Sequence, residues 1–224
     1  MTPAAPQAAA AAAMRIECRG VGHRYSAGRG LDPVSFTLTG PGLAAVTGPN
    51  GSGKSTLLRI LAGLLRPVAG DSVVSVSGRE VPAPERRHVT GWLAPELQFY
   101  GEFTVRENLD FAAEARGLAH GREAVLNAAR AVGLSERLGD RAAALSSGLR
   151  QRLRLAFAIL GDPPVLLFDE PGSHLDEAAR ERLAAFIQER RTSARVLVAT
   201  NDSREWSLAD ERITLGTRDL GDPS

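Results

Sequence analysis

The chain has 224 residues, of which 43% are hydrophobic and 24% charged, a composition typical of one substantial soluble globular domain and not of a disordered chain. Its 27 basic and 26 acidic residues give a net charge of +1, which argues against nucleic acid or an anionic lipid surface as a partner. The single cysteine, Cys18, excludes an internal disulfide framework and a multi-cysteine metal site, and no apolar run reaches the roughly 20 residues of a membrane-spanning helix.

The first part of the chain is predicted to be rich in strands. Residues 1–13 are Ala- and Pro-rich, without charge and without the pattern of a secretory signal, which predicts a disordered tail. We then expect a glycine-rich segment at Gly48–Gly53 and a helix that begins at Lys54. The strands expected around them are Arg15–Cys18, Val34–Thr39, Leu43–Thr47, Val73–Val76 and Val89–Leu93.

The second part alternates helices and strands. From about Val105 to Leu160, apolar residues recur at three- and four-residue spacing, which predicts helices. The apolar run Val165–Phe168 predicts a buried parallel strand. A helix at Asp176–Arg191 and strands at Val196–Ala199 and Ile213–Leu215 follow. This order predicts an α/β fold with a mainly parallel sheet, as a single domain over residues 14–220 with a helical insertion over about 97–160.

Residues 48–55, GPNGSGKS, fit the pattern G-x-x-x-x-G-K-[ST] between a predicted strand and a predicted helix. Glycines let successive N–H groups turn inward and cradle phosphate oxygens, and the helix adds its positive N-terminal end. Lys54 would bring a compact charge to the β- and γ-phosphates, and the Ser55 hydroxyl would bind Mg²⁺. The alternative is a glycine-rich turn that binds nothing, but Lys54 is the only lysine in a chain that otherwise uses arginine, which indicates a position where arginine is not tolerated. The nucleotide-binding residues predicted here are Gly48, Pro49, Asn50, Gly51, Ser52, Gly53, Lys54, Ser55 and Thr56.

Two carboxylates, Asp169 and Glu170, directly follow the apolar strand. Asp169 is expected to hold the Mg²⁺ shell, and Glu170 to orient and deprotonate the attacking water. The alternative, two acidic residues in a surface turn, is weakened by the buried strand that precedes them.

Between these motifs lies Leu145-Ser-Ser-Gly-Leu149. Taken by itself, this segment favours an ordinary helix N-cap. Together, the three segments resemble the nucleotide-binding subunit of ABC transporters, over about residues 15–215. In that family the segment, usually LSGGQ, caps the γ-phosphate of ATP bound to the opposite subunit, and Ser146 and Gly148 match it.

The resemblance implies an ATP hydrolase that uses ATP and Mg²⁺, with a P-loop NTPase (RecA-like) core, an N-terminal antiparallel β subdomain and an inserted helical subdomain. It further implies dimerisation with a second copy or a homologous subunit. The partner it drives would be a separately encoded transmembrane permease, which holds it on the cytoplasmic face of the membrane, with no nucleic-acid partner. The compact length is similar to that of small exporter-type subunits, including those of haem export for cytochrome c assembly.

Other segments match the family residue by residue. Tyr25, upstream of the first β hairpin, stands where the family stacks an aromatic ring on adenine, unless it is a packed core tyrosine. Residues 173–176, SHLD, resemble the D-loop that contacts the partner subunit, and Asp176 is alternatively the N-cap of the next helix. Residues 99–109 resemble the stretch that leads into the helical subdomain and faces the membrane partner.

Three motifs depart from the family pattern. Pro95 stands where the Q-loop glutamine is expected, so Glu96, or else Gln98, would substitute for it. Ser147 and Leu149 replace Gly and Gln in the signature. Asn201 replaces the switch histidine, and an asparagine can donate a hydrogen bond to a phosphate but cannot titrate. The sequence therefore supports ATP binding better than fast hydrolysis.

Two other functions stay open: an ATP-binding regulatory subunit with weak hydrolysis, and a soluble ABC ATPase without a transport role. A P-loop kinase or GTPase is disfavoured, because it leaves the signature segment unexplained. His23, His88, His120 and His174 have no ligand spacing, so we expect no metal held by them. Arg150, Arg152 and Arg154 are expected to form a solvated helix face.

Overall fold

The computed structural model describes residues 14–25, 29–173 and 175–216, so the predicted tail, His174 and residues 217–220 lie outside it. The strands are β1 (Arg15–Arg24), β2 (Gly30–Thr39), β3 (Gly42–Thr47), β4 (Ala69–Val76), β5 (Arg79–Glu80), β6 (Thr90–Leu93), β7 (Val165–Asp169), β8 (Arg195–Ala199) and β9 (Glu211–Thr214). The helices are α2 (Lys54–Leu61), α3 (Val105–Ala115), α4 (Gly121–Ala131), α5 (Ser147–Ile159), α6 (Glu177–Arg190) and α7 (Ser203–Trp206), with short 3₁₀ helices at Ala83–His88, Ser135–Arg137 and Ala142–Ala144.

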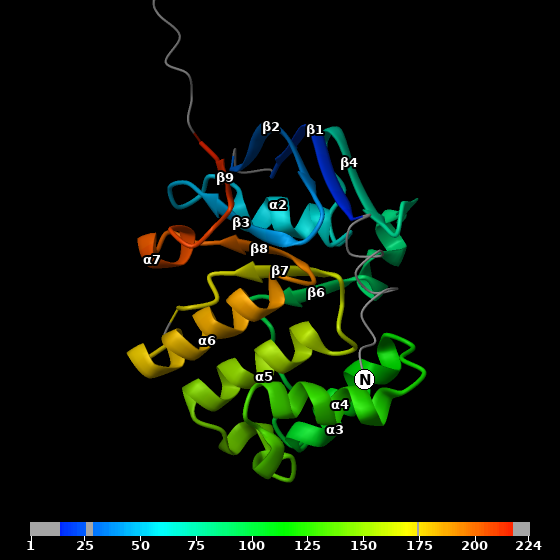
Figure 1. The fold of residues 1–224 in the computed structure, drawn as a ribbon, viewed down its shortest axis with the longest axis vertical. Coiled ribbons are helices and arrows are strands. Elements are labelled where there is room, and N and C mark those ends of the chain that lie inside the picture. The colour runs from blue at the N-terminus through cyan, green and yellow to red at the C-terminus, as the bar shows by residue number, and fades with distance from the viewer. Residues whose placement is uncertain (1–13, 26–28, 174, 217–224) are drawn as a thin grey trace, which may run out of the picture.

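The strands form two sheets. One is antiparallel, in the order β2-β1-β4-β5, and the other is parallel, in the order β6-β7-β8-β3-β9. Figure 1 shows α2 between the two sheets, and α5 and α6 on the other side of the parallel sheet. The helices α3 and α4 lie beyond α5. This arrangement confirms the predicted fold class: a parallel-sheet core, an antiparallel β subdomain and a helical insertion.

The parallel sheet is buried on both faces because alternate residues of its central strands enter two different cores. In β7, Val165 and Leu167 pack with α2 and the antiparallel sheet, whereas Leu166 and Phe168 pack with the helices of the other face. The β8 strand divides in the same way. A strand covered on both faces needs an uninterrupted apolar run, which is the sequence that β7 has.

Two expectations need correction. The arginines of α5 do not share a solvated face, because residues two positions apart point to opposite sides of a helix. Arg154 is half-buried and donates to the Leu97 carbonyl 3.2 Å away, while Arg152 faces a cavity on the α6 side. The first strand extends to Arg24, so Tyr25 lies inside the β1–β2 hairpin and not upstream of it.

The strand order places three loops at one edge of the sheet. The strands β7, β8 and β3 are parallel neighbours, so their carboxyl ends meet. Ligands of open α/β sheets bind at this edge. The segments that follow these strands are the glycine-rich loop after β3, Asp169–Glu170 at the end of β7, and Thr200–Asn201 after β8.

Candidate functional site

The glycine-rich loop has a backbone that only glycine adopts freely. Gly53 is the N-cap of α2 with φ of +99°, and a Cβ there would lie 2.7 Å from the Gly30 carbonyl oxygen. Gly48 has φ of +147°, and a Cβ there would lie 2.5 Å from the Leu215 carbonyl oxygen. Both positions therefore require glycine for two reasons, the backbone angle and the lack of space.

The start of α2 is open to an anion. The first N–H groups of a helix have no partner within the helix. In α2 no side chain caps them, and the first turn contains no acidic residue. The buried Ser52 Oγ also has no hydrogen-bond partner in the described structure. These donors, together with the positive end of the helix, form a phosphate-binding arrangement.

Lys54 is held at the centre of this loop. It is 8% exposed, and its Nζ donates to the Gly48 carbonyl at 2.8 Å and to Asn201 Oδ1 at 3.0 Å. Asn201 Nδ2 in turn donates to Asn50 Oδ1 at 2.7 Å. The structure thus brings Asn201, from the end of β8, against both the lysine and the loop that precedes it. The ammonium charge is positioned before any ligand binds, which reduces the cost of ordering a long side chain on binding.

The two carboxylates at the end of β7 lie beside this loop. Burial raises the pKa of Asp169, although a hydrogen bond from Ser55 acts to lower it. The Asp169 Oδ1 atom is buried and has no hydrogen-bond partner in the described structure. Burial also raises the pKa of Glu170, which the Lys54 charge partly offsets. Glu170 has φ of +47°, a strained angle for a non-glycine residue, and its N–H donates to the Ala199 carbonyl at 2.8 Å. An oxygen without a partner, next to a serine hydroxyl, is a donor set that suits Mg²⁺.

The signature segment lies elsewhere. Ser146 is the N-cap of α5, and its Oγ accepts from the Leu149 N–H at 3.3 Å. The α5 helix packs in the core on the face of the parallel sheet opposite to α2. Ser146 and Gly148 are therefore at a helix N-terminus, as expected, but in a different layer of the chain from the glycine-rich loop.

Comparison with known proteins agrees with these features. Residues 31–173 match the family described as ABC transporter. The chain belongs to the ABC transporter family. It is 35% identical to the lipoprotein-releasing system ATP-binding protein LolD 1 of Caulobacter vibrioides, over 92% of this chain and 97% of that protein. It is 36% identical to the sulfate/thiosulfate import ATP-binding protein CysA of Mycobacterium bovis, over 86% of this chain but only 56% of that relative, so it spans little more than half the CysA length.

Solved structures give the same fold. An ATP-binding subunit of an ABC transporter matches with a TM-score of 0.76 and 28% identity, over 89% of this chain and 85% of that one. MJ0796, a bacterial ABC transporter cassette solved as a dimer, matches with a TM-score of 0.78 and 24% identity, over 89% and 94% of the two chains. The second likeness concerns the fold alone.

At the expected Q-loop of this ABC cassette, Glu96 forms an ion pair with Arg59 of α2. Burial acts to raise the pKa of Glu96, but the hydrogen bond and charge of Arg59 hold it below its ordinary value. The Glu96 charge also acts to raise the pKa of Asp169, so the two carboxylates are close enough to interact electrostatically. Sequence reasoning missed Arg59, although its spacing of four from Ser55 places both on one face of α2 and was an available signal.

Tyr25 lies beside the start of α2. Its side chain is 40% exposed, its hydroxyl is 3.5 Å from Thr56 Oγ1, and its ring packs edge-on against His23. The ring is therefore not a packed core residue, and it is accessible to a ligand on the glycine-rich loop.

The D-loop segment is tied to the neighbouring loops. Ser173 Oγ donates to the Glu170 carbonyl at 2.8 Å, and Asp176 is the N-cap of α6, accepting from the Ala179 N–H at 2.7 Å. Sequence reasoning missed Glu205 of α7, whose carboxylate is so close to Gly172 that a Cβ there would lie 2.0 Å from Glu205 Oε1. Burial raises the pKa of Glu205, opposed by a hydrogen bond from Thr200. No local pattern in the sequence indicated this contact.

We expect Asp169→Asn to stabilise the nucleotide-free protein. Because burial raises the folded-state pKa of Asp169 above its unfolded value, the folded protein favours the protonated form. The contribution of protonated Asp169 to the free energy of unfolding is therefore present at low pH and is lost as the pH rises through the folded-state pKa. Without a bound cation, ionised Asp169 therefore destabilises the protein near neutral pH, and the neutral amide removes this cost.

Thermal unfolding of the nucleotide-free variant at pH 5 and pH 8 tests this expectation. At pH 8 we expect the variant to have a free energy of unfolding about 1 kcal/mol higher than the unmodified protein, and a melting temperature about 2–4 °C higher. At pH 5 we expect a smaller increase in both quantities. Asp110→Asn, at an exposed position of α3, is the matched control and leaves the melting temperature unchanged. A lower melting temperature for Asp169→Asn at pH 8 contradicts the argument.

Proposed function

We propose that this cassette hydrolyses ATP and energises a transporter through ATP-dependent dimerisation. The observation that carries the proposal is the convergence of Lys54, Asn201 and the Asp169–Glu170 pair at one edge of the parallel sheet. The glycine-rich loop would hold the phosphates of ATP, with Lys54 against the β- and γ-phosphates and the Tyr25 ring against the base.

The roles proposed for the remaining residues follow from their surroundings. Glu170 accepts the proton of the attacking water, and its raised pKa brings it closer to the range of an effective general base. Asn201 donates a hydrogen bond to the γ-phosphate, and Glu96 stands at the Q-loop position, where its charge acts on Asp169. Ser55 and Asp169 would hold Mg²⁺, which when bound neutralises charge on the phosphate oxygens.

Dimerisation is proposed because the signature and the glycine-rich loop lie in different layers of one chain. A second copy, or a homologous subunit, would supply Ser146 and Gly148 to complete each ATP site. This serine cap and the N–H groups at the start of α5 form an anion site of the type that a γ-phosphate needs. The cassette MJ0796, which has the same fold, was solved as a dimer, and this supports the dimer proposed here.

A transmembrane permease, encoded separately, is the proposed partner, with the cassette on the cytoplasmic face of the membrane. None of the helices in the described part of the chain has the length and hydropathy of a transmembrane segment. Three large exposed aromatic side chains, Tyr100, Phe103 and Phe111, form a contact cluster at the start of the helical insertion. Buried Asn108 holds the loop that carries two of them through bonds to the Tyr100 N–H and carbonyl, so this apolar patch is fixed and fits a docking role.

The names of relatives give no support to the expected haem export. They refer to lipoprotein release and to sulfate/thiosulfate import. The cargo is determined by the permease, so we propose transport coupling without a named substrate. Asn201 and Ser147 still motivate the alternative of a regulatory subunit that binds ATP with weak hydrolysis.

Steady-state hydrolysis measured over a wide range of protein concentration tests the proposal. If two chains complete each site, the turnover per chain rises with protein concentration until the dimer is saturated. A constant turnover per chain on dilution contradicts the dimer. ATP binding without turnover at any concentration favours the regulatory alternative.

A further inference from the structure

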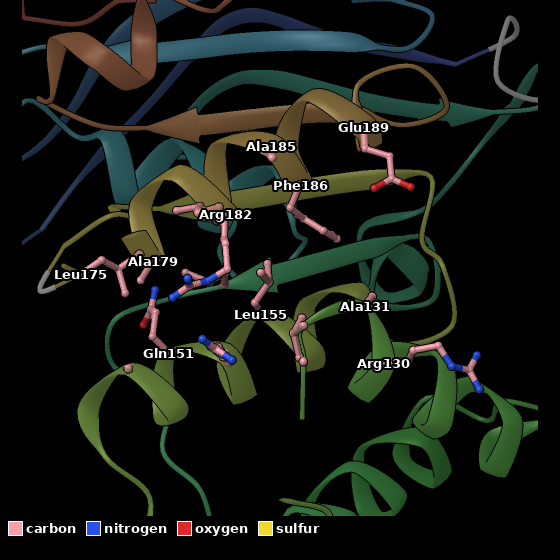
Figure 2. A pocket seen from close by; sticks show the side chains of 16 residues that line it. Arg130, Ala131, Gln151, Leu155, Leu175, Ala179, Arg182, Ala185, Phe186 and Glu189 are labelled. Carbon is pink, nitrogen blue, oxygen red and sulfur yellow. The ribbon is translucent and has the colours of Figure 1, made fainter. Parts of the chain in front are cut away.

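A cavity of about 460 Å³ lies between the helical insertion and the core. Its walls come from the end of α4 and from the facing sides of α5 and α6, and Figure 2 shows side chains of α5 and α6 directed toward one another across it. It lies on the face of the parallel sheet opposite to α2, and none of the residues proposed to bind the phosphates lines it, except the signature glycine Gly148 at its mouth. Its volume falls in the range of small-molecule sites.

The floor of the cavity is apolar. Leu155 of α5 and Leu183 and Phe186 of α6 line it, with Leu93 of β6 behind them. An apolar lining on three elements gives a bound molecule a surface from which water is excluded.

The polar side chains of the cavity are mainly arginines. Arg130, Arg152 and Arg182 line it, against one carboxylate, Glu189. Arg130 donates to Asn127 at 3.0 Å, whereas the side chains of Arg152 and Arg182 form no hydrogen bond or ion pair within the described part of the chain. Of the two, Arg152 is partly buried and Arg182 is exposed. Other partly buried arginines of the described residues have such partners, for example Arg154 with Leu97 and Arg195 with Glu211.

Gly133 makes room for one of these groups. A Cβ at this position would lie 3.2 Å from Arg152 Nη1, and Gly133 has φ of +70°. The Arg152 guanidinium therefore lies close to Gly133 at the wall of the cavity, where a side chain at position 133 would crowd it. In Figure 2 the side chain of Arg182 reaches from α6 toward Gln151 of α5.

We propose that this cavity binds a small anionic amphiphile: a carboxylate or sulfonate carried on an apolar body. Two unpaired guanidinium groups are donors that match such a head group, and the leucine and phenylalanine floor matches the body. The ligand would contact both the helical insertion and the core. This binding does not depend on the function proposed for the ATP site.

Titration with the fluorescent probe anilinonaphthalene sulfonate tests the proposal, in the presence of saturating ADP so that the glycine-rich loop is filled. We expect Arg152→Gln combined with Arg182→Gln to weaken probe binding about tenfold or more, because charge-assisted hydrogen bonds to the head group are lost. Arg122→Gln, at an exposed position of α4 outside the cavity, is the matched control and leaves the affinity unchanged. Equal affinity in the double variant and the control overturns the proposal.

A competition experiment on the unmodified protein keeps the test independent of the folding of the variants. Decanoate is expected to displace the probe, and decanol, which has the same chain without the charge, to displace it at least tenfold less effectively. Equal displacement by the two compounds would show a purely apolar site and overturns the proposal. Displacement by further ADP, and not by decanoate, would show a second nucleotide site and also overturns it.

Discussion

Replacing Glu170 with glutamine is expected to lower ATP turnover by about 10²–10⁴-fold while ATP binding is retained. The carboxamide has the same size and the same access to the site, but it cannot accept a proton from the attacking water. The strained backbone at Glu170 is held by its N–H bond to the Ala199 carbonyl and by Ser173, neither of which involves the Glu170 side chain. The substitution should therefore preserve the fold and the loop.

Phosphate release and sedimentation in Mg-ATP measure the two consequences. If hydrolysis separates the dimer, the variant should accumulate as an ATP-bound dimer. Glu181→Gln, at an exposed position of α6, is the matched control and should behave as the unmodified chain. Unchanged turnover in Glu170→Gln would falsify the role of general base, and a strictly monomeric variant in saturating Mg-ATP would count against the shared site.

Replacing Lys54 with alanine is expected to weaken ATP binding by about 10²-fold and to reduce turnover by about 10²–10³-fold. The change removes the positive charge at the centre of the loop. It also leaves the Gly48 carbonyl and Asn201 Oδ1 without their shared donor. Both the attraction for phosphate and the preorganisation of the loop are lost.

Lys54→Arg distinguishes charge from shape at the same position. The Lys54 ammonium donates to the Gly48 and Pro49 carbonyls and to Asn201, oxygens that converge on one point, and it is almost completely buried. A longer planar guanidinium does not fit this arrangement, so we expect Lys54→Arg to resemble Lys54→Ala in turnover. Isothermal titration with ATP and steady-state assays measure both variants. Normal ATP affinity in Lys54→Ala would exclude the predicted phosphate site.

The elements that the sequence predicted well are those whose signal is local. The apolar run Val165–Phe168 predicts a strand buried on both faces, and alternate residues do enter two cores. The glycine spacing of residues 48–53 predicts a loop whose backbone turns its N–H groups inward, and Gly48, Gly51 and Gly53 all have the positive φ that glycine permits. In both cases one short segment carries all the physical constraints.

Contacts between distant segments were only partly accessible. The adjacency of Asp169 and Asn201 to the glycine-rich loop follows from the parallel order of β7, β8 and β3, which alternation of strands and helices indicates in general but not in its order. The ion pair of Arg59 with Glu96, 37 residues apart, and the approach of Glu205 to Gly172 have no pattern in the chain.

The sequence by itself determined the fold class, the glycine-rich loop between a strand and a helix, and the acidic strand end, because each depends on periodicity, backbone freedom or a motif within a few consecutive residues. Only the tertiary structure decided that Asn201 bonds Lys54, that Arg154 reaches the Leu97 carbonyl, and that the α5–α6 cavity contains two arginines whose side chains have no hydrogen bond or ion pair among the described residues. These features depend on which strands become neighbours and how two helices pack. Such packing is set by the whole core and not by any one segment of the chain.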